Sequence, residues 1–223
     1  RYSTRGGGSQ LIIGNPDLDA EYTYNADLGL KYLSARVKGY VSVFYNRVDD
    51  YIDLVKQDSS FLANIPTYGY VNVEDAELYG IDAEATLHLT SRLDLETAIA
   101  WVEGKDRDTH EHLSAIAPLN GRIGLRYAAP LTDSMRYSLR AQATLYDRQR
   151  NVSDSEDETP GYTTFDLHAG LNLGAWAMFD AIDLNLSVKN LLDRGYRSHL
   201  RSSQETWIYE PGRNIVVGLQ CTF

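Results

Sequence analysis

The chain has 223 residues and a formal net charge of -10 at pH 7, which argues against nucleic acid because phosphates require a basic surface. Its single cysteine, Cys221, excludes an intrachain disulfide. No apolar run approaches the roughly 18 residues that a membrane-spanning helix needs, whereas strands can hide their apolarity by alternation.

Nine segments show apolar residues at every second position, the period of strands whose two faces meet different surroundings. In the last segment Ile215, Val217 and Leu219 share one face, and Gly218 and Gln220 lie on the other. The sequence therefore predicts nine antiparallel strands. In chain order they lie within residues 22–32, 37–46, 81–89, 93–101, 123–127, 137–145, 165–173, 184–189 and 213–223.

Short and long connections alternate strictly between these segments. This alternation places all short turns at one end and all long loops at the other, as in outer-membrane barrels with short periplasmic turns and longer external loops. The final strand then runs inward, and Phe223 ends at the periplasmic rim. Residues 1–14 show no strand pattern and are expected to be the end of an external loop. The short links are 34–35, 90–91, 128–134 and 174–182, and the long ones are 57–66, 104–118, 147–161 and 191–212.

Aromatic residues on the apolar face support a membrane. Tyrosine is frequent, with 16 residues against 5 Phe and 3 Trp, and its apolar ring with a polar tip suits an interface. A soluble antiparallel sandwich or lipocalin-like barrel also alternates, but it does not require two aromatic girdles. The topology puts Tyr22, Tyr24, Tyr45 and Trp101 at the external end, and Tyr32, Tyr127 and Phe223 at the periplasmic end.

The strand count suggests an incomplete barrel. Bacterial single-chain barrels are even-stranded and closed, and an open edge in hydrocarbon would leave backbone groups unpaired. We therefore expect residues 1–223 to be the C-terminal portion of an outer-membrane β-barrel that lacks its first strands. A complete ten-stranded barrel is the alternative.

Five motifs, in order along the chain, resemble landmarks of TonB-dependent outer-membrane receptors. Each is weak alone because its turn chemistry is generic, but the order is specific. The matching residues are Asn15, Pro16, Leu18 and Glu21; Phe44–Ile52; Tyr70–Asn72 with Gly80–Glu84; Asn190, Leu191, Asp193 and Tyr196; and Pro211, Gly212 and Arg213 before a strand ending in Phe223.

This resemblance implies a barrel of about 22 strands, plugged by an N-terminal domain absent here, of which this chain supplies the last nine. It implies a multi-pass protein of the Gram-negative outer membrane that imports a scarce nutrient, such as a ferric siderophore, haem, vitamin B12 or another metal chelate. The implied partners are the TonB–ExbB–ExbD system through the plug, outer-membrane lipid and lipopolysaccharide, and the barrel-assembly machinery through the C-terminal strand. No resident cofactor and no enzymatic activity are expected. The alternative is a small complete barrel acting as a porin, adhesin or enzyme.

The last external loop is the candidate cargo site. Its aromatic faces and Arg donors suit anionic, ring-bearing cargo, although a packed loop at the membrane rim would show the same residues. The candidate residues are Tyr196, Arg197, His199, Arg201, Trp207 and Tyr209.

Three other segments carry weaker signals. The run from His110 to His112 lacks the i, i+4 spacing of a helical zinc site and a third ligand, so no metal site is predicted. The acidic run from Asp154 to Glu158 is expected to solvate its loop or to hold divalent cations near lipopolysaccharide. The run from Gly6 to Ser9 lacks the strand–turn–helix context of a nucleophile elbow.

Overall fold

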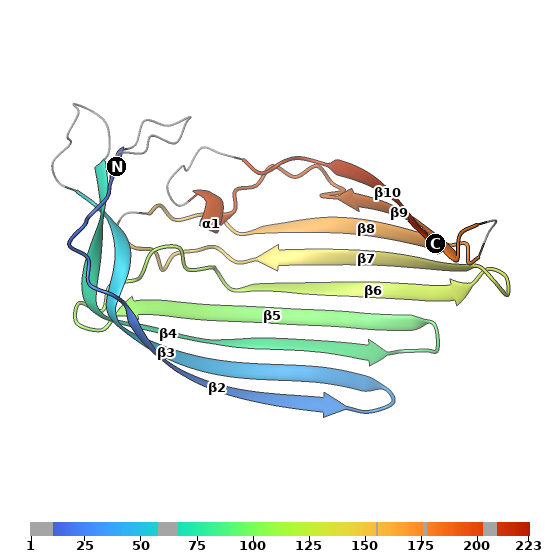
Figure 1. The fold of residues 1–223 in the computed structure, drawn as a ribbon, viewed down its shortest axis with the longest axis horizontal. Helices are drawn as coiled ribbons and strands as arrows, with labels where there is room; N and C mark the ends of the chain where they lie inside the picture. The colour runs from blue at the N-terminus through green and yellow to red at the C-terminus, as the bar shows by residue number, and fades with distance from the viewer. Residues whose placement is uncertain (1–10, 58–66, 155, 176–177, 203–208) are drawn as a thin grey trace.

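The structure, a computed structural model, describes residues 11–57, 67–154, 156–175, 178–202 and 209–223. Its centre is one antiparallel sheet in which each strand lies beside the next strand of the chain, from β2 at one edge to β10 at the other (Figure 1). This confirms the nine predicted strands. They are β2 (Tyr22–Leu33), β3 (Val37–Lys56), β4 (Thr67–His88), β5 (Leu93–Asp106), β6 (Asn120–Pro130), β7 (Arg136–Tyr146), β8 (Tyr162–Asn172), β9 (Ala181–Lys189) and β10 (Asn214–Thr222).

The opening residues depart from the prediction. A tenth short strand, β1 (Leu11–Ile13), pairs in parallel with the start of β4, so the expectation of no strand before Gly14 is wrong. Three residues are too few for a period of two to be recognised. The predicted loop 57–66 lies almost entirely outside the described residues.

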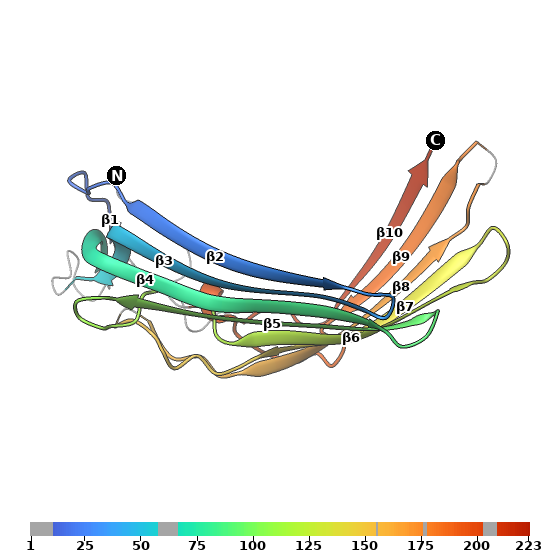
Figure 2. The ribbon, with the colours of Figure 1, turned by 90° about the horizontal axis from the view of Figure 1, so that it is seen from below.

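The sheet is a single curved layer (Figure 2). A sandwich would need a second sheet packed on the first, so the soluble sandwich alternative is wrong. Short turns lie at one end of the sheet and the longer connections at the other, as predicted (Figure 1). Among the described residues, no helix is both long and apolar enough to cross a membrane.

The strand register aligns the predicted apolar residues into continuous rows across the sheet. Side chains directly opposite each other in an antiparallel pair lie on one face, so each row shows what that face presents. We call this face the apolar face; the sequence parity is thereby confirmed. One complete row consists of Val37, Leu87, Leu95, Leu125, Ala141, Leu167, Val188 and Ile215.

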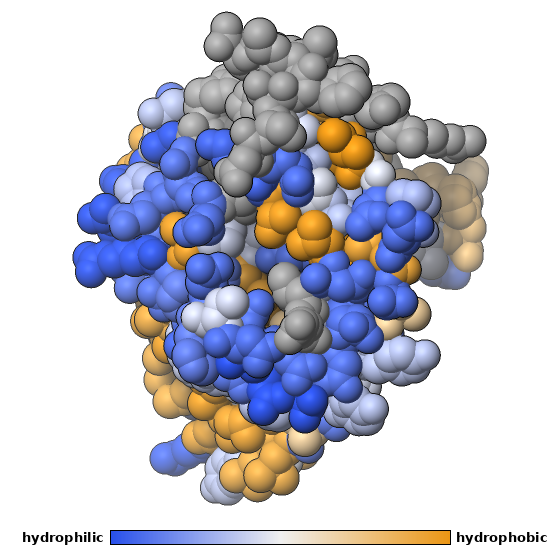
Figure 3. Space-filling view, turned by 90° about the vertical axis from the view of Figure 1, so that its left-hand side faces the viewer, coloured by the Kyte–Doolittle hydropathy of each residue, from blue (hydrophilic) through white to orange (hydrophobic). Residues whose placement is uncertain are grey.

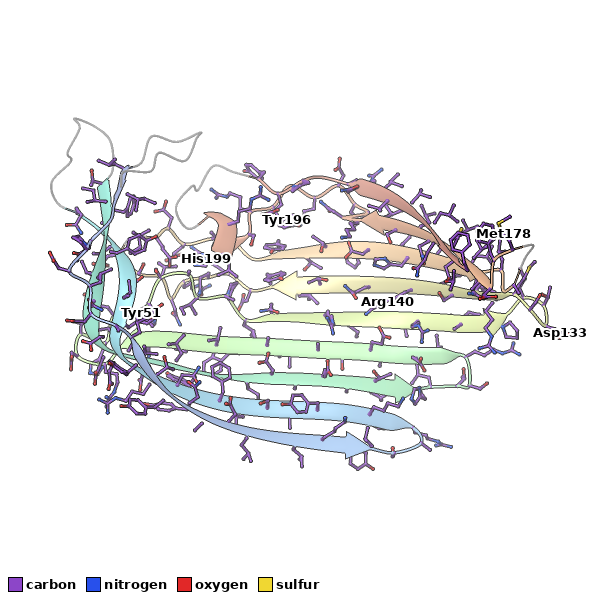
Figure 4. All side chains as sticks on the ribbon, in the orientation of Figure 1. Tyr51, Asp133, Arg140, Met178, Tyr196 and His199 are labelled. Atoms are coloured by element: carbon purple, nitrogen blue, oxygen red, sulfur yellow. The ribbon has the colours of Figure 1, made fainter. Side chains whose placement is uncertain are left out.

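We call the opposite face of the sheet the polar face. Charged side chains of neighbouring strands lie side by side on it. Arg126 and Arg140 are direct neighbours in the register of β6 and β7. Their like charges are offset by carboxylates of β5: Asp94 lies 3.6 Å from Arg126, and Glu96 lies 2.7 Å from Arg140. Asp94 also lies 2.7 Å from the Nδ1 atom of His88. Arg140 lies near the middle of the sheet in Figure 4.

Aromatic rings bound the apolar face at both ends. At the loop end Tyr45 is opposite Tyr79, whose ring meets Trp101 edge-on at 5.8 Å between centroids. At the turn end the rings of Tyr127 and Tyr137 are 5.9 Å apart, and those of Phe179 and Phe223 are 4.9 Å apart. Beyond the Tyr45 row the same face becomes charged, because Arg47 is opposite Glu77.

The small buried core lies at the loop end, not in the centre of the sheet. β3 and β4 extend past the other strands there (Figure 1), and the β5–β6 loop packs on their polar-face residues. Leu113 and Ile116 of this loop cluster with Val48 and Ala76. Seen from this end, most of the surface is hydrophilic, and hydrophobic residues gather along its lower side (Figure 3).

Candidate functional site

The first three sequence landmarks bind one another at the loop end. Asp50 has a positive φ of 58° and lacks a ladder partner between Asp49 and Tyr51. The side chain of Asn72 donates to the carbonyl of Asp50 at 2.6 Å, and it also accepts from the backbone N–H of Asp19 at 2.9 Å. The carboxylate of Glu21 accepts from the N–H of Ile52 at 2.8 Å. These hydrogen bonds therefore hold the first three landmark segments together.

The last two landmarks are likewise joined to each other by a hydrogen bond. Asn190 and Asp193 both have positive φ, and the Asn190 side chain bonds both the N–H and the carbonyl of Arg194 at 2.9 Å. The carboxylate of Asp193 accepts from the N–H of Arg213 at 2.7 Å. A Cβ at Gly212 would lie 2.5 Å from that carboxylate, which explains the glycine. The motif residues thus shape the exit from β9 and the entry into β10.

Glu156 ties three loops together. Its carboxylate accepts from the N–H of Ala115 in the β5–β6 loop at 2.7 Å. It lies 3.6 Å from Nε2 of His199, which belongs to the short helix α1 (His199–Ser202) in the β9–β10 loop. Nδ1 of His199 is 3.1 Å from the hydroxyl of Thr159. The side chains of Glu156 and His199 are only 3% and 1% exposed, so this contact is internal.

The surroundings of Glu156 favour the ionised form of its side chain. Burial alone would raise its pKa, but the contact with His199 and the hydrogen bond from Ala115 outweigh burial and lower the pKa. Burial, and then the negative charges of Asp53, Glu21 and Glu156, raise the pKa of Tyr51 to about 12. Tyr51 lies on the extended part of β3 (Figure 4). The loop cluster is therefore built around a charged carboxylate beside an un-ionised phenol.

Further buried polar contacts hold the same loops. Ser114 donates from its hydroxyl to the carboxylate of Asp53 on β3. The side chain of Gln149 donates to the carbonyl of Ile116 at 2.8 Å. Because polar groups are costly to bury without partners, these bonds specify how the loops meet. The β5–β6, β7–β8 and β9–β10 loops therefore form one packed unit.

Three tyrosines stack beside this unit. Tyr146 and Tyr162 are opposite each other at the ends of β7 and β8, with ring centroids 4.7 Å apart. Tyr196 of the last loop stacks on Tyr162 at 4.3 Å. Tyr146 is opposite Asn120 in the register, which places the stack on the polar face. Burial, followed by the charge of Glu210, raises the pKa of Tyr196, so this phenol stays neutral at pH 7.

A cavity on the polar face adjoins the stack. Its volume is about 510 Å³, within the range of small-molecule sites. Its lining combines an aromatic ring, a guanidinium and carboxylates, so it can offer both stacking and charge-assisted hydrogen bonds. The lining includes Tyr40, Asp82, Glu84, Asn120, Arg122 and Tyr146.

The structure gives the candidate cargo residues different contacts within the last loop. Tyr196 joins the tyrosine stack, and His199 is buried at the Glu156 contact (Figure 4). The guanidinium of Arg197 lies 5.8 Å from the centre of the exposed Tyr209 ring. Arg201 pairs with Glu210 at 3.0 Å. Trp207 lies outside the described residues.

Sequence reasoning missed Tyr146 and Tyr162, although both border the loop 147–161 and so must meet at the end of one hairpin. It also missed Glu156, because the run from Asp154 to Glu158 was expected to be solvated. In this run Asp154 and Glu158 are exposed, but the side chain of Glu156 is only 3% exposed. An acidic run gives no local signal of which carboxylate points inward.

The segment 110–112 also has a structural role. His112 forms an isolated bridge with Lys105 and lies 3.0 Å from Glu103, whereas His110 is exposed with a positive φ. Within the described ranges, no three His, Cys, Asp or Glu side chains are placed to hold a metal ion.

Comparison with known proteins identifies a family. A family model described as "TonB dependent receptor-like, beta-barrel" matches residues 1–191. The chain is 30% identical to "Heme/hemopexin utilization protein C" of Haemophilus influenzae, over 95% of this chain and 31% of that protein.

Solved structures show the same fold. "Copper transporter OprC" is 21% identical, with a TM-score of 0.75 over 91% of this chain and 32% of that one. The ferric enterobactin receptor PfeA from Pseudomonas aeruginosa, solved with enterobactin, is 21% identical, with a TM-score of 0.63 over 94% of this chain and 32% of that one. The chain therefore spans about a third of the length of these relatives. The comparisons fit a receptor and not the alternative of a small porin, adhesin or enzyme.

Proposed function

This chain belongs to the family of TonB-dependent receptor β-barrels, which are outer-membrane transport receptors, and on that premise we propose that its parent protein imports a metal chelate across the Gram-negative outer membrane. The names of these relatives refer to haem utilisation, to copper transport and to a receptor for ferric enterobactin. Haem or a ferric siderophore with catechol rings fits this chain best, since both present aromatic rings and negative charge.

Residues 1–223 form the C-terminal portion of that barrel in this proposal. The sheet leaves β2 and β10 each with a neighbour on one side only within the described residues, apart from short contacts of the loops. Barrel walls close on themselves in a membrane because unpaired backbone groups in hydrocarbon are costly. The remaining strands and a plug domain would come from the rest of the protein.

The two faces of the sheet give its orientation in the bilayer. The apolar face, bounded by aromatic rings, contacts lipid as a multi-pass β-barrel wall, and the polar face lines the lumen. The short turns are periplasmic and the packed loops are external, where cargo arrives.

The observation that carries the cargo assignment is the stack of Tyr146, Tyr162 and Tyr196. Its rings lie on the lumenal side of the external end, next to the cavity that Arg122 lines. Aromatic faces and guanidinium donors together suit an anionic, ring-bearing chelate. Arg197, Arg201, Trp207 and Tyr209 are expected to complete the site, while His199 positions the loop.

Three partners follow from this placement. The TonB–ExbB–ExbD system would supply energy through the proposed plug domain. The strand that ends at Phe223 would engage the barrel-assembly machinery. Outer-membrane lipid and lipopolysaccharide would surround the apolar face.

Growth on defined sources tests the function. A strain lacking the receptor should lose growth on a haem, ferric siderophore or cobalamin source, and the full-length gene should restore it only with intact TonB. Rescue on none of these sources, or rescue without TonB, would contradict the proposal.

The tyrosine stack can be tested in the same full-length protein. Tyr196→Ala should raise the Kd for the rescuing cargo about 2–10-fold, because one aromatic contact contributes about 0.5–1.5 kcal/mol. Tyr196→Phe keeps the ring and serves as the matched control. Binding titrations in detergent give the Kd, and equal affinities of both variants and the wild type would exclude Tyr196 from the site.

A further inference from the structure

The cavity beside the tyrosine stack has a floor of two small side chains on β5. Ala98 and Ala100 are consecutive residues of the polar face of this strand, and both line the cavity. In the register, each alanine lies between a carboxylate of β4 and a polar residue of β6. Small side chains between larger ones leave a hollow, so this cavity is built from strand residues and not from loops.

The row of residues through Ala100 gives the cavity two different ends. Asp82 is opposite Ala100, which is opposite Asn120, which in turn is opposite Tyr146. Asp82 and Tyr146 are therefore three strand spacings apart, about 14 Å. The cavity has a carboxylate at one end and a ring of the tyrosine stack at the other.

The row through Ala98 carries two charges that offset each other. Glu84 is opposite Ala98, and Ala98 is opposite Arg122. The guanidinium of Arg122 lies 4.0 Å from the carboxylate of Glu84, so this pair spans the alanine between them. Arg122 is the cation of the cavity lining, and it is thereby placed beside Glu84.

The carboxylate of Asp82 has no such counter-charge. Asp82 is exposed and lines the cavity, and across the described ranges no hydrogen bond or ion pair engages its side chain. Its neighbours on the polar face are Ser42 on β3, Ala100 on β5, and Gly80 and Glu84 on β4. Since none of these neighbours is positively charged, the cavity presents one free negative charge.

This free charge conflicts with a cargo that is anionic throughout. Like charges repel more strongly in a partly desolvated cavity than in water, so a purely anionic ligand would be disfavoured next to Asp82. An ammonium or guanidinium group on the cargo would replace that repulsion with a charge-assisted hydrogen bond. The charge of the cavity therefore selects among the chelates that the tyrosine stack could accept.

We propose that Asp82 is a specificity-determining residue that selects a metal chelate with a cationic arm. The ammonium or guanidinium group of the arm binds Asp82 over Ala100, and the rings of the chelate lie against the tyrosine stack. This inference rests on the proposed function, because it takes the cavity as part of the cargo site. It favours a ferric siderophore over haem, whose charged side groups are carboxylates.

An inorganic cation fits Asp82 less well than an organic one. Hard divalent cations take several oxygen ligands, whereas Glu84, the other carboxylate of the lining, already lies beside Arg122. An ammonium group needs fewer partners, and the nearby phenol ring of Tyr146 also attracts cations.

The test uses the full-length receptor purified in detergent and two probes. One is the iron complex of a synthetic tris-catecholate with a primary amine arm, and the other is the same complex with that amine acetylated. Acetylation removes the positive charge and keeps the rings and the iron. The wild type should bind the amine probe about tenfold more tightly, the effect of one hydrogen bond to a charged group. Asp82→Asn should bring the ratio of the two Kd values close to one.

The matched control is Asp27→Asn. Asp27 is exposed on the same face but lies outside the cavity, opposite Phe44, and its replacement changes the net charge equally. This variant should keep the tenfold ratio. Ala100→Leu fills the floor of the cavity and should abolish the ratio although Asp82 is present. Unchanged affinity of both Asn variants for the acetylated probe shows that they are folded.

Three results would overturn the inference. Equal affinity of the wild type for both probes would indicate that another part of the receptor neutralises Asp82. Loss of the ratio in Asp27→Asn as well would indicate a general effect of net charge. Binding of neither probe would reject a cationic chelate, and growth on haem or cobalamin would then leave the proposed function in place.

The opposite separation is also possible, because the titrations require neither TonB nor a membrane. A receptor that fails the growth test but shows the ratio that depends on Asp82 would retain this site and lose the proposed function.

Discussion

At the scale of single residues, the Asn, Asp and Glu side chains of the sequence landmarks connect segments of the chain by hydrogen bonds. Asn72 holds the carbonyl of Asp50 where a positive φ interrupts the ladder, and Asn190 closes the turn after β9. An Asn side chain suits both roles because it offers a donor and an acceptor on one short arm. The landmarks therefore place the loops that carry the candidate cargo site.

Glu156 gives a prediction about pH. Its folded-state pKa is lowered from the ordinary value of 4.5, so the ionised carboxylate stabilises the loop unit above about pH 4.5. This contribution is lost as the pH falls through the folded-state pKa, where Glu156 becomes protonated. A spin label at exposed Asp157 in a cysteine-free receptor should be immobile at pH 7 and become mobile only below about pH 4.5.

The matched variant is Glu156→Gln, which cannot ionise. Its label should be more mobile at pH 7 than that of the wild type and should not respond to acid in this range. A wild-type transition centred above about pH 5.5 would assign the response to another group.

At the scale of elements, each strand separates two environments. The rows across β3 to β10 are apolar on one face and rich in ion pairs on the other, as with Arg140 and Glu96. β3 and β4 continue beyond the aromatic rows, and there Arg47 pairs with Asp75 at 2.7 Å on the former apolar face. The change from leucine to ion pairs along one face marks where the hydrocarbon ends.

The face assignment predicts opposite outcomes for neighbouring positions in β9. Leu186 lies on the apolar face opposite Val217 and Ala169, so Leu186→Arg should cost about 2–4 kcal/mol if it meets the middle of the bilayer. Asn185→Arg should cost little, because Asn185 lies on the polar face between Gly170 and Gly218. Folding titrations of the full-length barrel into vesicles measure both values. Equal penalties would contradict the face assignment.

At the scale of the whole molecule, the sheet is an open wall. Its edges, β2 and β10, are long and expose Leu28, Leu30 and Val217. In water such edges and surfaces promote association, and in lipid the unpaired backbone groups cost several kcal/mol each. In the proposed barrel, the stability of this portion would therefore depend on neighbouring strands from the rest of the protein.

This dependence can be measured on residues 1–223 alone. Added to vesicles without the rest of the protein, they should not form a protease-resistant monomer, whereas the full-length receptor should. A monodisperse, protease-resistant monomer of residues 1–223 would show that the two edges can close on each other, and the proposed division of the barrel would be wrong.

The sequence by itself determined the nine strands from β2 to β10, their two faces and the alternation of short and long connections, but not the short strand β1. These features are local: a period of two and the chemistry of turns are visible within ten residues. It also marked Tyr196 as a candidate, because an aromatic residue among arginines in a loop stands out.

Only the tertiary structure decided which distant residues meet. Asn72 reaches Asp19, Glu156 reaches Ala115 and His199, and Tyr162 stacks between Tyr146 and Tyr196. It also set the extra length of β3 and β4, where alternation fades because both faces meet protein or water. Such contacts depend on how the loops pack in space, and alternation along the chain does not reveal which residues of different loops meet.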